Sequence, residues 1–447
     1  MRDAFQGLTT RGRSFVAAGI AVLVAAAASA ADDLLRIAVL LLALPVVSAL
    51  VVSRTRYRLS SGRRLWSPRT AAGQESAVTL RLDNISRLPT GLLLVEDRVP
   101  YVLGSRPRFV LDRVEPRGRR EVTYTVRSDV RGRYQLGPLS IRLTDPFGMC
   151  ELTRSFSSRD TLVVTPPVQE LPLVPLTGEW TGSGESRSRS LASAGEDDAG
   201  TREYRQGDDL RRVHWRSTAR LGQLMVRREE QPWQARCTVL LDTRGTAHGG
   251  EGPGSSFEWA VSAAASVAIH LVQHGYFVRL VTDTGAQVGG GELAIDGRGA
   301  DVEGAILDSL AVIDTSSNAS LRDAGASLRR GGGDGLLVAV LGSLAPEEAR
   351  LLSRLRHGST SAVAVLLDAQ SWGSPSRRGG PATGAAGGSA TLLRAAGWRV
   401  LPARAGDSLP ELWRDASRHR VPDPLDPANT AGKVAESPDA RVAGVGS

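Results

Sequence analysis

A chain of 447 residues is long enough for two or three domains, and a net charge of +8 is compatible with a nucleic acid or an anionic membrane as a partner. Lys433 is the single lysine among 55 basic residues, however, and this arginine bias with abundant Ala and Gly points to a GC-rich genome rather than to a polyanion site. The single lysine excludes a Walker phosphate loop and argues against a Schiff-base lysine. Cys150 and Cys237 provide neither a zinc framework nor a disulfide pattern.

Two apolar segments open the chain, at residues 14–31 and 34–52. Each is close to the roughly 20 residues that a membrane-spanning helix needs, and Asp32-Asp33 between them leaves room only for a hairpin turn. Arginines flank both outer ends, which the positive-inside rule places in the cytoplasm. Residues 1–56 are therefore predicted to form a two-pass hairpin in the inner or plasma membrane, with the N-terminus and the soluble domains in the cytoplasm. A cleaved signal peptide is the alternative, because Ala28-Ser29-Ala30 resembles a cleavage site.

The next region, residues 57–170, shows strand signals without a helical stretch. Residues 77–82, 121–127 and 139–143 alternate between apolar and polar side chains, and turn-forming residues separate these runs. The pattern predicts a small antiparallel β-sandwich. Residues 171–200 are rich in Gly and Ser, which predicts a linker or loop.

Residues 201–420 are predicted to contain an α/β domain, because continuous apolar strands alternate there with amphipathic helices. The expected strands are residues 237–242, 276–282, 335–341, 362–367 and 398–401, and the expected helices are residues 257–274, 302–313, 346–356 and 409–417. This alternation is typical of a Rossmann-type parallel sheet. Residues 373–390 have low complexity and predict a flexible insertion, and residues 421–447 predict a disordered tail.

The segment GTREYRQGDDLRRVHWRSTARLGQLMVRREE, residues 200–230, interleaves arginines with carboxylates and aromatic residues. One interpretation is a phosphate-binding surface, since arginine forks match phosphate and Trp215 or Tyr204 could stack on a base. The favoured interpretation is an internal network of arginine–carboxylate pairs, with Trp215 as a buried anchor and turns at Gly207 and Gly222. A mixed arrangement, in which outer arginines dock an acidic partner protein, stays open.

The pattern in this segment closely resembles the signature of the domain-of-unknown-function 58 family. The residues that carry the resemblance are Arg202, Glu203, Tyr204, Gly207, Asp208, Asp209, Arg211, Arg212, Trp215, Ala219, Arg220 and Gly222. A second hallmark, Arg131–Glu151, contains D-P-F-G followed by Met149. We interpret it as a strand, a tight turn and a buried Phe147, without a catalytic role.

Members of this family resemble von Willebrand factor A domains, whose metal-ion-dependent adhesion site has the motif D-x-S-x-S. Asp242, at the tip of the first predicted strand, and Thr246 match the first and last positions, and Asp283 after the second strand is a further candidate ligand. Mg²⁺ prefers such carboxylate and hydroxyl oxygens. Arg244 stands at the first Ser position, however, where its charge opposes a cation. Asp242, Thr246 and Asp283 are therefore predicted to be a degenerate site, with Mg²⁺ as the candidate cofactor.

The resemblance implies a non-catalytic, membrane-anchored binding or scaffold protein. Similar proteins are commonly encoded beside MoxR-type AAA+ ATPases and transglutaminase-like membrane proteins, so these are the expected partners in assembly or maturation of cell-envelope or membrane-associated clients. The surface around Asp242 is the expected docking site. The alternatives are a divalent-metal-dependent hydrolase that uses Asp242 and Asp283, and a nucleic-acid-binding module that uses the arginine segment. The small number of carboxylates argues against the hydrolase, and the interleaved acids argue against nucleic acid.

Overall fold

The computed structural model describes residues 7–29, 31–55, 59–87, 89–145, 147–174, 201–204, 213, 215–227, 236–288, 300–330, 335–355, 361–373 and 385–418. By its contacts the chain divides into two compact units. One unit comprises Met1–Pro167 with Leu307–Ile313, and the other comprises Val168–Ile306 with Asp314–Ser447. The hairpin and the β-sandwich thus fall into one unit. Most of the predicted linker, at residues 175–200, and the predicted tail from residue 421 lie outside the described residues.

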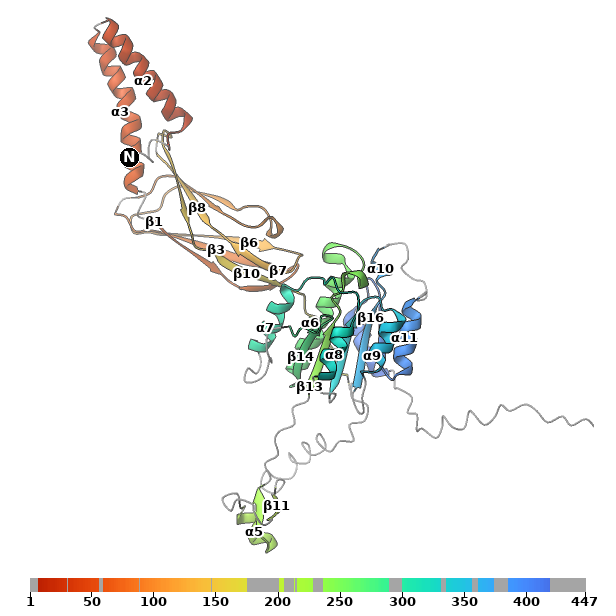
Figure 1. The fold of residues 1–447 in the computed structure, drawn as a ribbon. Coiled ribbons are helices and arrows are strands. Elements are labelled where there is room, and N and C mark those ends of the chain that lie inside the picture. The colour runs from red at the N-terminus through yellow and green to blue at the C-terminus, as the bar shows by residue number, and fades with distance from the viewer. Residues whose placement is uncertain are drawn as a thin grey trace, which may run out of the picture. The chain divides into compact units, whose positions relative to one another are not determined.

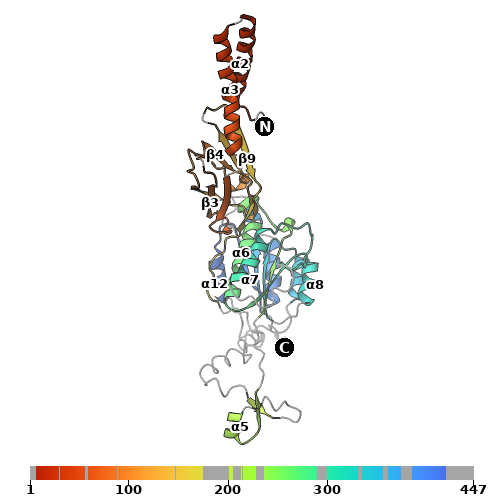
Figure 2. The ribbon, with the colours of Figure 1, turned by 90° about the vertical axis from the view of Figure 1, so that its left-hand side faces the viewer.

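The chain opens with two helices, α2 (Thr10–Ser29) and α3 (Asp32–Thr55), which run side by side in Figures 1 and 2. Both are long and apolar enough to cross a membrane. Gly19 permits their close approach, because a Cβ atom there would lie 2.8 Å from Cγ of Leu42. Large apolar side chains such as Leu40 point outward, with 67% of its surface exposed. An apolar outer surface on a helix pair is what a lipid environment favours.

Within the described residues, the β-sandwich is built from three sheets. The first has the strand order β1-β3-β6, the second β5-β4-β8-β9 and the third β2-β10-β7. The strands are β1 (Leu59–Leu65), β2 (Arg69–Ala71), β3 (Glu75–Asn84), β4 (Leu93–Asp97), β5 (Arg108–Leu111), β6 (Arg119–Arg127), β7 (Gly132–Leu136), β8 (Leu139–Thr144), β9 (Glu151–Phe156) and β10 (Asp160–Thr165). Alternating residues pack the first sheet onto the second, for example Leu80 of β3 and Ile141 of β8. The predicted sandwich is present, although β10 pairs with β2 in parallel.

The second hallmark, Arg131–Glu151, forms strands β7 and β8 as predicted, but Phe147 is 54% exposed, so the predicted burial of this ring is wrong. The turn is held instead by Asp145, whose carboxylate accepts hydrogen bonds from the backbone N–H groups of Phe147 and Cys150. Arg131 at the start of the hallmark is buried, and its guanidinium donates to the backbone oxygens of Leu310 (2.9 Å) and Ile313 (2.5 Å). A cation is favourable at such helix C-terminal carbonyls.

The second unit contains a five-stranded parallel sheet with the order β14-β13-β15-β16-β17. Its strands are β13 (Arg236–Leu241), β14 (Phe277–Thr282), β15 (Leu336–Leu341), β16 (Ser361–Leu367) and β17 (Arg399–Ala403). Its helices are α6 (Ser256–Gln273), α7 (Ala300–Ala311, whose last turns belong to the first unit), α8 (Arg322–Arg330), α9 (Pro346–Ser353), α10 (Gln370–Gly373), α11 (Ala385–Ala395) and α12 (Leu409–Arg418). The predicted α/β alternation is confirmed.

Both faces of the sheet are covered, because adjacent residues of its central strands are buried on both sides. One face, with Leu240 and Ala339, packs against helices α8, α9 and α11. The opposite face carries α6 and α12. These helices meet where the rings of His270 and Trp413 pack edge to face, with 6.3 Å between the ring centroids. Figure 2 shows α12 and α8 on opposite sides of this unit.

One prediction for this region needs correction. Residues 385–390, assigned to a flexible insertion, form the start of α11, where Ser389 and Ala390 are buried. Small side chains allow that helix to pack closely, and the same small side chains gave the segment its low-complexity composition. Residues 374–384 lie outside the described part.

The signature segment forms a small unit of β11 (Thr201–Glu203), α5 (Trp215–Leu221) and β12 (Met225–Arg227), with β11 antiparallel to β12. Trp215 is 71% exposed, so the prediction of a buried anchor is wrong. The apolar contacts come from Val213, Met225 and Val226, which are buried. Gly222 makes the predicted turn, with φ of +71° directly after α5.

Candidate functional site

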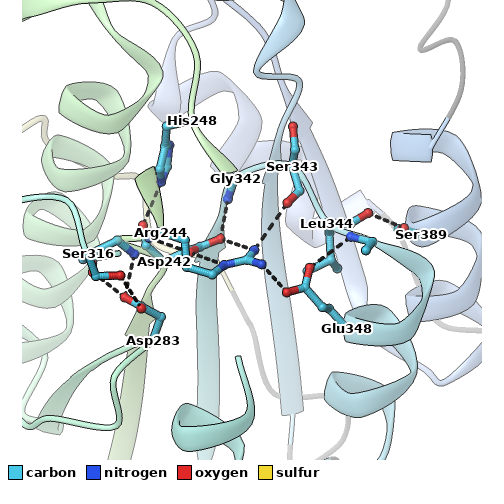
Figure 3. A network of polar contacts seen from close by, with 12 residues as sticks. Asp242, Arg244, His248, Asp283, Ser316, Gly342, Ser343, Leu344, Glu348 and Ser389 are labelled. Carbon is cyan, nitrogen blue, oxygen red and sulfur yellow. Dashed lines mark hydrogen bonds and ion pairs between the residues drawn. The ribbon is translucent and has the colours of Figure 1, made fainter. Parts of the chain in front are cut away.

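The carboxyl edge of the parallel sheet forms the candidate site. Strand β13 lies between β14 and β15. The chain continues from β13 to β14 on one side and from β15 to β16 on the other, so it leaves the carboxyl ends of β13 and β15 in opposite directions. In open α/β sheets this reversal opens a crevice in which ligands bind. Asp242 follows β13 directly and Gly342 follows β15. Figure 3 shows the side chains that meet at this edge.

Asp242 and Arg244 form a buried pair at the centre of the edge. The Arg244 side chain donates to both carboxylate oxygens of Asp242, through Nε at 2.9 Å and Nη2 at 2.8 Å. The backbone N–H groups of Arg244 (3.1 Å) and Gly342 (3.2 Å) also donate to this carboxylate. Asp242 is fully buried and Arg244 is 3% exposed. Burial alone requires such pairing, because an unpaired charge in the interior is very costly.

Glu348 completes the network from the opposite side of the crevice. It lies in the first turn of α9, and its carboxylate pairs with Nη1 of Arg244. Its second oxygen accepts a hydrogen bond from the backbone N–H of Ala345 (3.1 Å), which caps the helix. Burial lowers the pKa of Arg244, but the hydrogen bonds and charges of Asp242 and then Glu348 raise it more, so the pKa lies above its ordinary value. Arg244 is therefore a fixed positive charge.

Asp283 belongs to a neighbouring but separate cluster. One of its oxygens accepts hydrogen bonds from the backbone N–H (3.0 Å) and the hydroxyl of Thr243, and the other accepts from Ser316 Oγ (2.6 Å). Asp283 is fully buried. These bonds tie the loops after β13 and β14 together, which is a structural role for the carboxylate.

His248 holds the loop after β13 in place. Its Nε2 donates to the backbone oxygen of Asp242 (2.8 Å), so in the neutral ring Nδ1 accepts from the Ser256 hydroxyl (3.1 Å). The Ser256 oxygen in turn accepts from the backbone N–H of Gly249 (2.9 Å). Burial lowers the pKa of His248, and the nearby charge of Arg244 adds to this, although Asp242 opposes it in part. Ser256 is fully buried and lacks the exposure that a nucleophile needs.

A cavity of about 630 Å³ opens above this network. Arg244 and Glu348 form part of its floor, and Thr246, Arg322 and Glu347 lie exposed on its wall. The volume is in the range of small-ligand pockets. Arg244 and Glu348 at its floor are paired with each other, whereas Thr246, Arg322 and Glu347 on its wall face solvent.

The residues at this edge do not fit a divalent cation. Asp242 already binds the guanidinium of Arg244, and Asp283 is engaged by Thr243 and Ser316. Thr246 is exposed on the cavity wall. In the described part of the chain, no three His, Cys, Asp or Glu side chains converge as a metal site would require. The guanidinium of Arg244 thus binds the carboxylate oxygens of Asp242 that a metal ion would need. The metal assignment for Asp242, Thr246 and Asp283 stays a prediction.

The structure adds residues that sequence reasoning missed, namely Glu348, His248 and Ser316. Of the signature residues, Gly207, Asp208, Asp209, Arg211 and Arg212 lie outside the described residues, so the predicted arginine–carboxylate network stays a prediction. Arg202 pairs with Val226 in the β11–β12 ladder, and Trp215, Ala219 and Arg220 lie on α5. The helix α5 exposes all three of these residues.

Comparisons with known proteins agree with the signature. Residues 200–289 match the family model described as "Protein of unknown function DUF58". The uncharacterized protein YeaD of Bacillus subtilis (strain 168) is 26% identical over 221 residues, which cover 48% of this chain and 53% of YeaD. The chain therefore spans about half the length of this relative.

Solved structures give weaker likenesses. The CARDB domain of PF1109 from Pyrococcus furiosus has 11% identity and a TM-score of 0.18, covering 24% of this chain and 92% of that one. The sporulation control protein Spo0M from Bacillus subtilis has 12% identity and a TM-score of 0.15, covering 33% of this chain and 58% of that one. These scores are too low to carry an argument about fold or function. The match over residues 200–289, which contains both the arginine signature and the strand-end Asp242, assigns this segment of the chain to the DUF58 family of proteins of unknown function.

Proposed function

We propose that this protein is a membrane-anchored binding or scaffold protein whose docking surface is the carboxyl edge of the parallel sheet. The observation that carries the proposal is the state of the charged groups there. Arg244 is paired with both Asp242 and Glu348 beneath an open cavity of about 630 Å³. A site built for hydrolysis needs a group free to act as base or nucleophile. Glu348 of this cavity is committed to Arg244, and Asp368 is paired with Arg404 at 3.9 Å. The exposed wall offers Arg322, Glu347 and Thr246 to a partner.

The fold supports a von Willebrand factor A-like assignment for this domain. Its sheet is parallel and covered on both faces, and an Asp follows the first strand at the carboxyl edge. In a von Willebrand factor A-like domain of this kind, the guanidinium of Arg244 balances the charge of Asp242. In this assignment the domain binds a partner without a metal ion at its centre.

The hairpin of α2 and α3 supplies the anchor in this proposal. Arg11 and Arg13 lie at the start of α2, and Arg54 lies at the end of α3. By the positive-inside rule both ends face the cytoplasm. The hairpin then spans an inner or plasma membrane, and the soluble domains lie in the cytoplasm. The connecting Asp32 and Asp33 then face the opposite side.

The partner class comes from the family resemblance. A MoxR-type AAA+ ATPase is the proposed partner, and a transglutaminase-like membrane protein is the second one to look for. The scaffold would couple the ATPase to assembly or maturation of envelope or membrane-associated clients.

The experiment that tests this function is a crosslinking pull-down of the full chain from native membranes. We expect an AAA+ ATPase with the wild type, and its loss with Glu347→Arg, which reverses a charge on the cavity wall. Arg350→Glu is the matched control, because Arg350 lies one turn further along α9, is exposed and does not line the cavity. Absence of any ATPase from every sample, or equal recovery with both variants, would refute the docking surface.

A further inference from the structure

The β-sandwich carries a second cavity, of about 570 Å³, at one end of its sheets. The residues that line it share a position after or between strand ends: Arg98, Val99, Pro100, Tyr101, Gly104, Ser105, Arg106, Gln135, Gly137, Pro138 and Arg159. Three of them are arginines and none is acidic. The cavity is thus a concave surface with positive charge only, in a part of the molecule that the proposed function does not use.

The arginines of this cavity are open to a ligand. Arg98, Arg106 and Arg159 are exposed, and the described part of the chain provides no ion pair or hydrogen bond to their guanidinium groups. Other exposed arginines of the sandwich do have partners; Arg108, for example, pairs with Glu96 at 3.3 Å. A guanidinium presents its donors in a fork that matches the two oxygens of a carboxylate.

The two acids next to these arginines in the sequence are paired with another arginine. Asp97 precedes Arg98 and Asp160 follows Arg159, but both carboxylates bind the buried Arg63, at 2.5 Å and 2.9 Å respectively. Asp97 is fully buried, and the side chain of Arg63 is 3% exposed. Although burial lowers the pKa of Arg63, its hydrogen bonds to Asp97 and Asp160 raise that pKa. Arg63 therefore stays charged and engages both acids, with Asp97 fully buried and Asp160 one-third exposed, so neither acid is paired with an arginine of the cavity.

The cavity also presents an aromatic ring on a fixed turn. Tyr101 is 91% exposed, in a turn closed by the hydrogen bond from Gly104 N to the Tyr101 oxygen (3.1 Å). Leu103 in the same turn is buried in the core and anchors it. The backbone of Arg98, which also lines the cavity, is held in place because its oxygen accepts a hydrogen bond from the backbone N–H of Gly137 (2.8 Å). Exposed Tyr beside Arg is the composition of hot spots in protein interfaces.

The position of the cavity argues against a lipid headgroup. It adjoins Pro138, directly before β8, whereas the other end of β8 adjoins the base of the hairpin. There, Thr9 N donates to the Met149 oxygen (2.9 Å), and Asp145 N donates to the Cys150 oxygen (3.2 Å). A strand of six residues separates the two ends by roughly 20 Å. Headgroups at the hairpin would therefore lie a strand length away from the arginines.

We propose that the cavity formed by Arg98, Arg106, Arg159 and Tyr101 binds an acidic peptide segment of a partner protein. The arginines bind Asp or Glu carboxylates in forked pairs, and Tyr101 packs against the peptide between them. This site is separate from the carboxyl edge of the parallel sheet and does not depend on the function proposed for that edge.

The test is fluorescence anisotropy with the full chain in neutral detergent and a fluorescein-labelled peptide of ten glutamates. We expect saturable binding that weakens about tenfold or more in the double variant Arg98→Ala/Arg159→Ala, because the variant removes two of the three guanidinium groups that form charge-assisted contacts. Tyr101→Ala is expected to weaken binding as well. Arg108→Ala/Arg142→Ala is the matched control with the same change in charge, because those side chains pair with Glu96 and Glu151 outside the cavity.

Competition identifies the chemistry of the ligand. Unlabelled glutamate peptide is expected to displace the probe, and dioctanoyl phosphatidylglycerol, a ten-nucleotide oligothymidylate and inorganic phosphate at equal charge are expected to do so more weakly. Equal binding by the double variant and its control would overturn the proposal. Stronger displacement by the lipid or by the oligonucleotide would overturn it too, in favour of those ligands. Unchanged circular dichroism and melting temperature confirm that the variants are folded.

Discussion

Arg244 is the residue on which the strand-end site depends most. Its guanidinium balances the buried carboxylate of Asp242 and also binds Glu348. Both carboxylates bind the same cation, and that cation is the Arg244 side chain. The sequence pattern showed only a misfit at the first Ser position of the D-x-S-x-S motif, whereas the structure shows what the misfit does.

We predict that Arg244→Ser lowers the free energy of unfolding by about 3 kcal/mol or more, because it leaves Asp242 buried without its counter-charge. The measurement is urea denaturation followed by circular dichroism. The exposed variant Arg350→Ser is the control and should change stability little. A loss below about 1 kcal/mol for Arg244→Ser, the level of an exposed ion pair, would show that the pair is not the support that its burial indicates.

His248 predicts a dependence of stability on pH. Its pKa in the folded protein is lowered by burial, so the unfolded chain, with an ordinary pKa of about 6.5, binds the proton first as pH falls. The contribution of the neutral ring is therefore complete above about pH 6.5 and is lost as pH falls from there toward the lower folded pKa.

The measurement is the free energy of unfolding between pH 7.5 and pH 5.5 for the wild type and for His248→Gln. We expect stability to fall with pH in both, because burial also lowers the pKa of His270, but less steeply in the variant. Identical slopes would contradict this role for His248.

At the scale of elements, the turn after β15 brings two loops of the edge into contact. A Cβ atom on Gly342 would lie 2.4 Å from the backbone oxygen of Ala247, and Gly342 N donates to Asp242 (3.2 Å). No side chain fits at that position unless the backbone of one loop moves.

We expect Gly342→Ala to lower stability by about 2 kcal/mol or more, since the clash is with backbone and disturbs the buried pair beside it. Gly254→Ala is the matched control, because a Cβ atom there meets nothing within 4 Å. The measurement is the melting temperature of both variants, which we expect to be lower for Gly342→Ala than for Gly254→Ala. Equal melting temperatures would show that the two loops are free to separate.

The sequence predicted the large elements because their apolar periodicity is strong. Strand β13 was expected at residues 237–242 and forms at Arg236–Leu241, and α6 was expected at residues 257–274 and forms at Ser256–Gln273. Helix α8 was missed because its buried residues, Ala324, Gly325 and Ser327, are small and provide none of the large apolar side chains that mark the predicted helices. The start of helix α11, residues 385–390, was assigned to an insertion because its side chains are also small.

The site was predictable only in part. Asp242 stood out because it follows a buried strand, but its network includes Glu348, 104 residues beyond Arg244, which only the sheet order brings into contact. The local signal at Glu348 was that of an acidic residue in the first turn of a predicted helix. Trp215 misled in the opposite direction, because a large aromatic residue predicts burial whereas this one is 71% exposed.

At the scale of the whole molecule, the chain combines an apolar hairpin, a β-sandwich and a parallel α/β sheet with a cavity at its carboxyl edge. The function proposed for this combination needs the partner to approach one particular edge of the sheet. Helix α6 runs from that edge back to the opposite one, so its end at Gln273 marks the amino edge, and Gln273 is exposed there. Thr246, exposed on the cavity wall, marks the carboxyl edge.

Site-specific photocrosslinking from these two positions tests the central claim most directly. A benzophenone amino acid is placed at Thr246 or at Gln273 of the full chain in native membranes, and crosslinked proteins are identified after irradiation. The docking surface proposed at the carboxyl edge predicts that an AAA+ ATPase is crosslinked from Thr246 and not from Gln273. Crosslinking from Gln273 alone, or no ATPase from either position while both proteins remain folded and in the membrane, would contradict it.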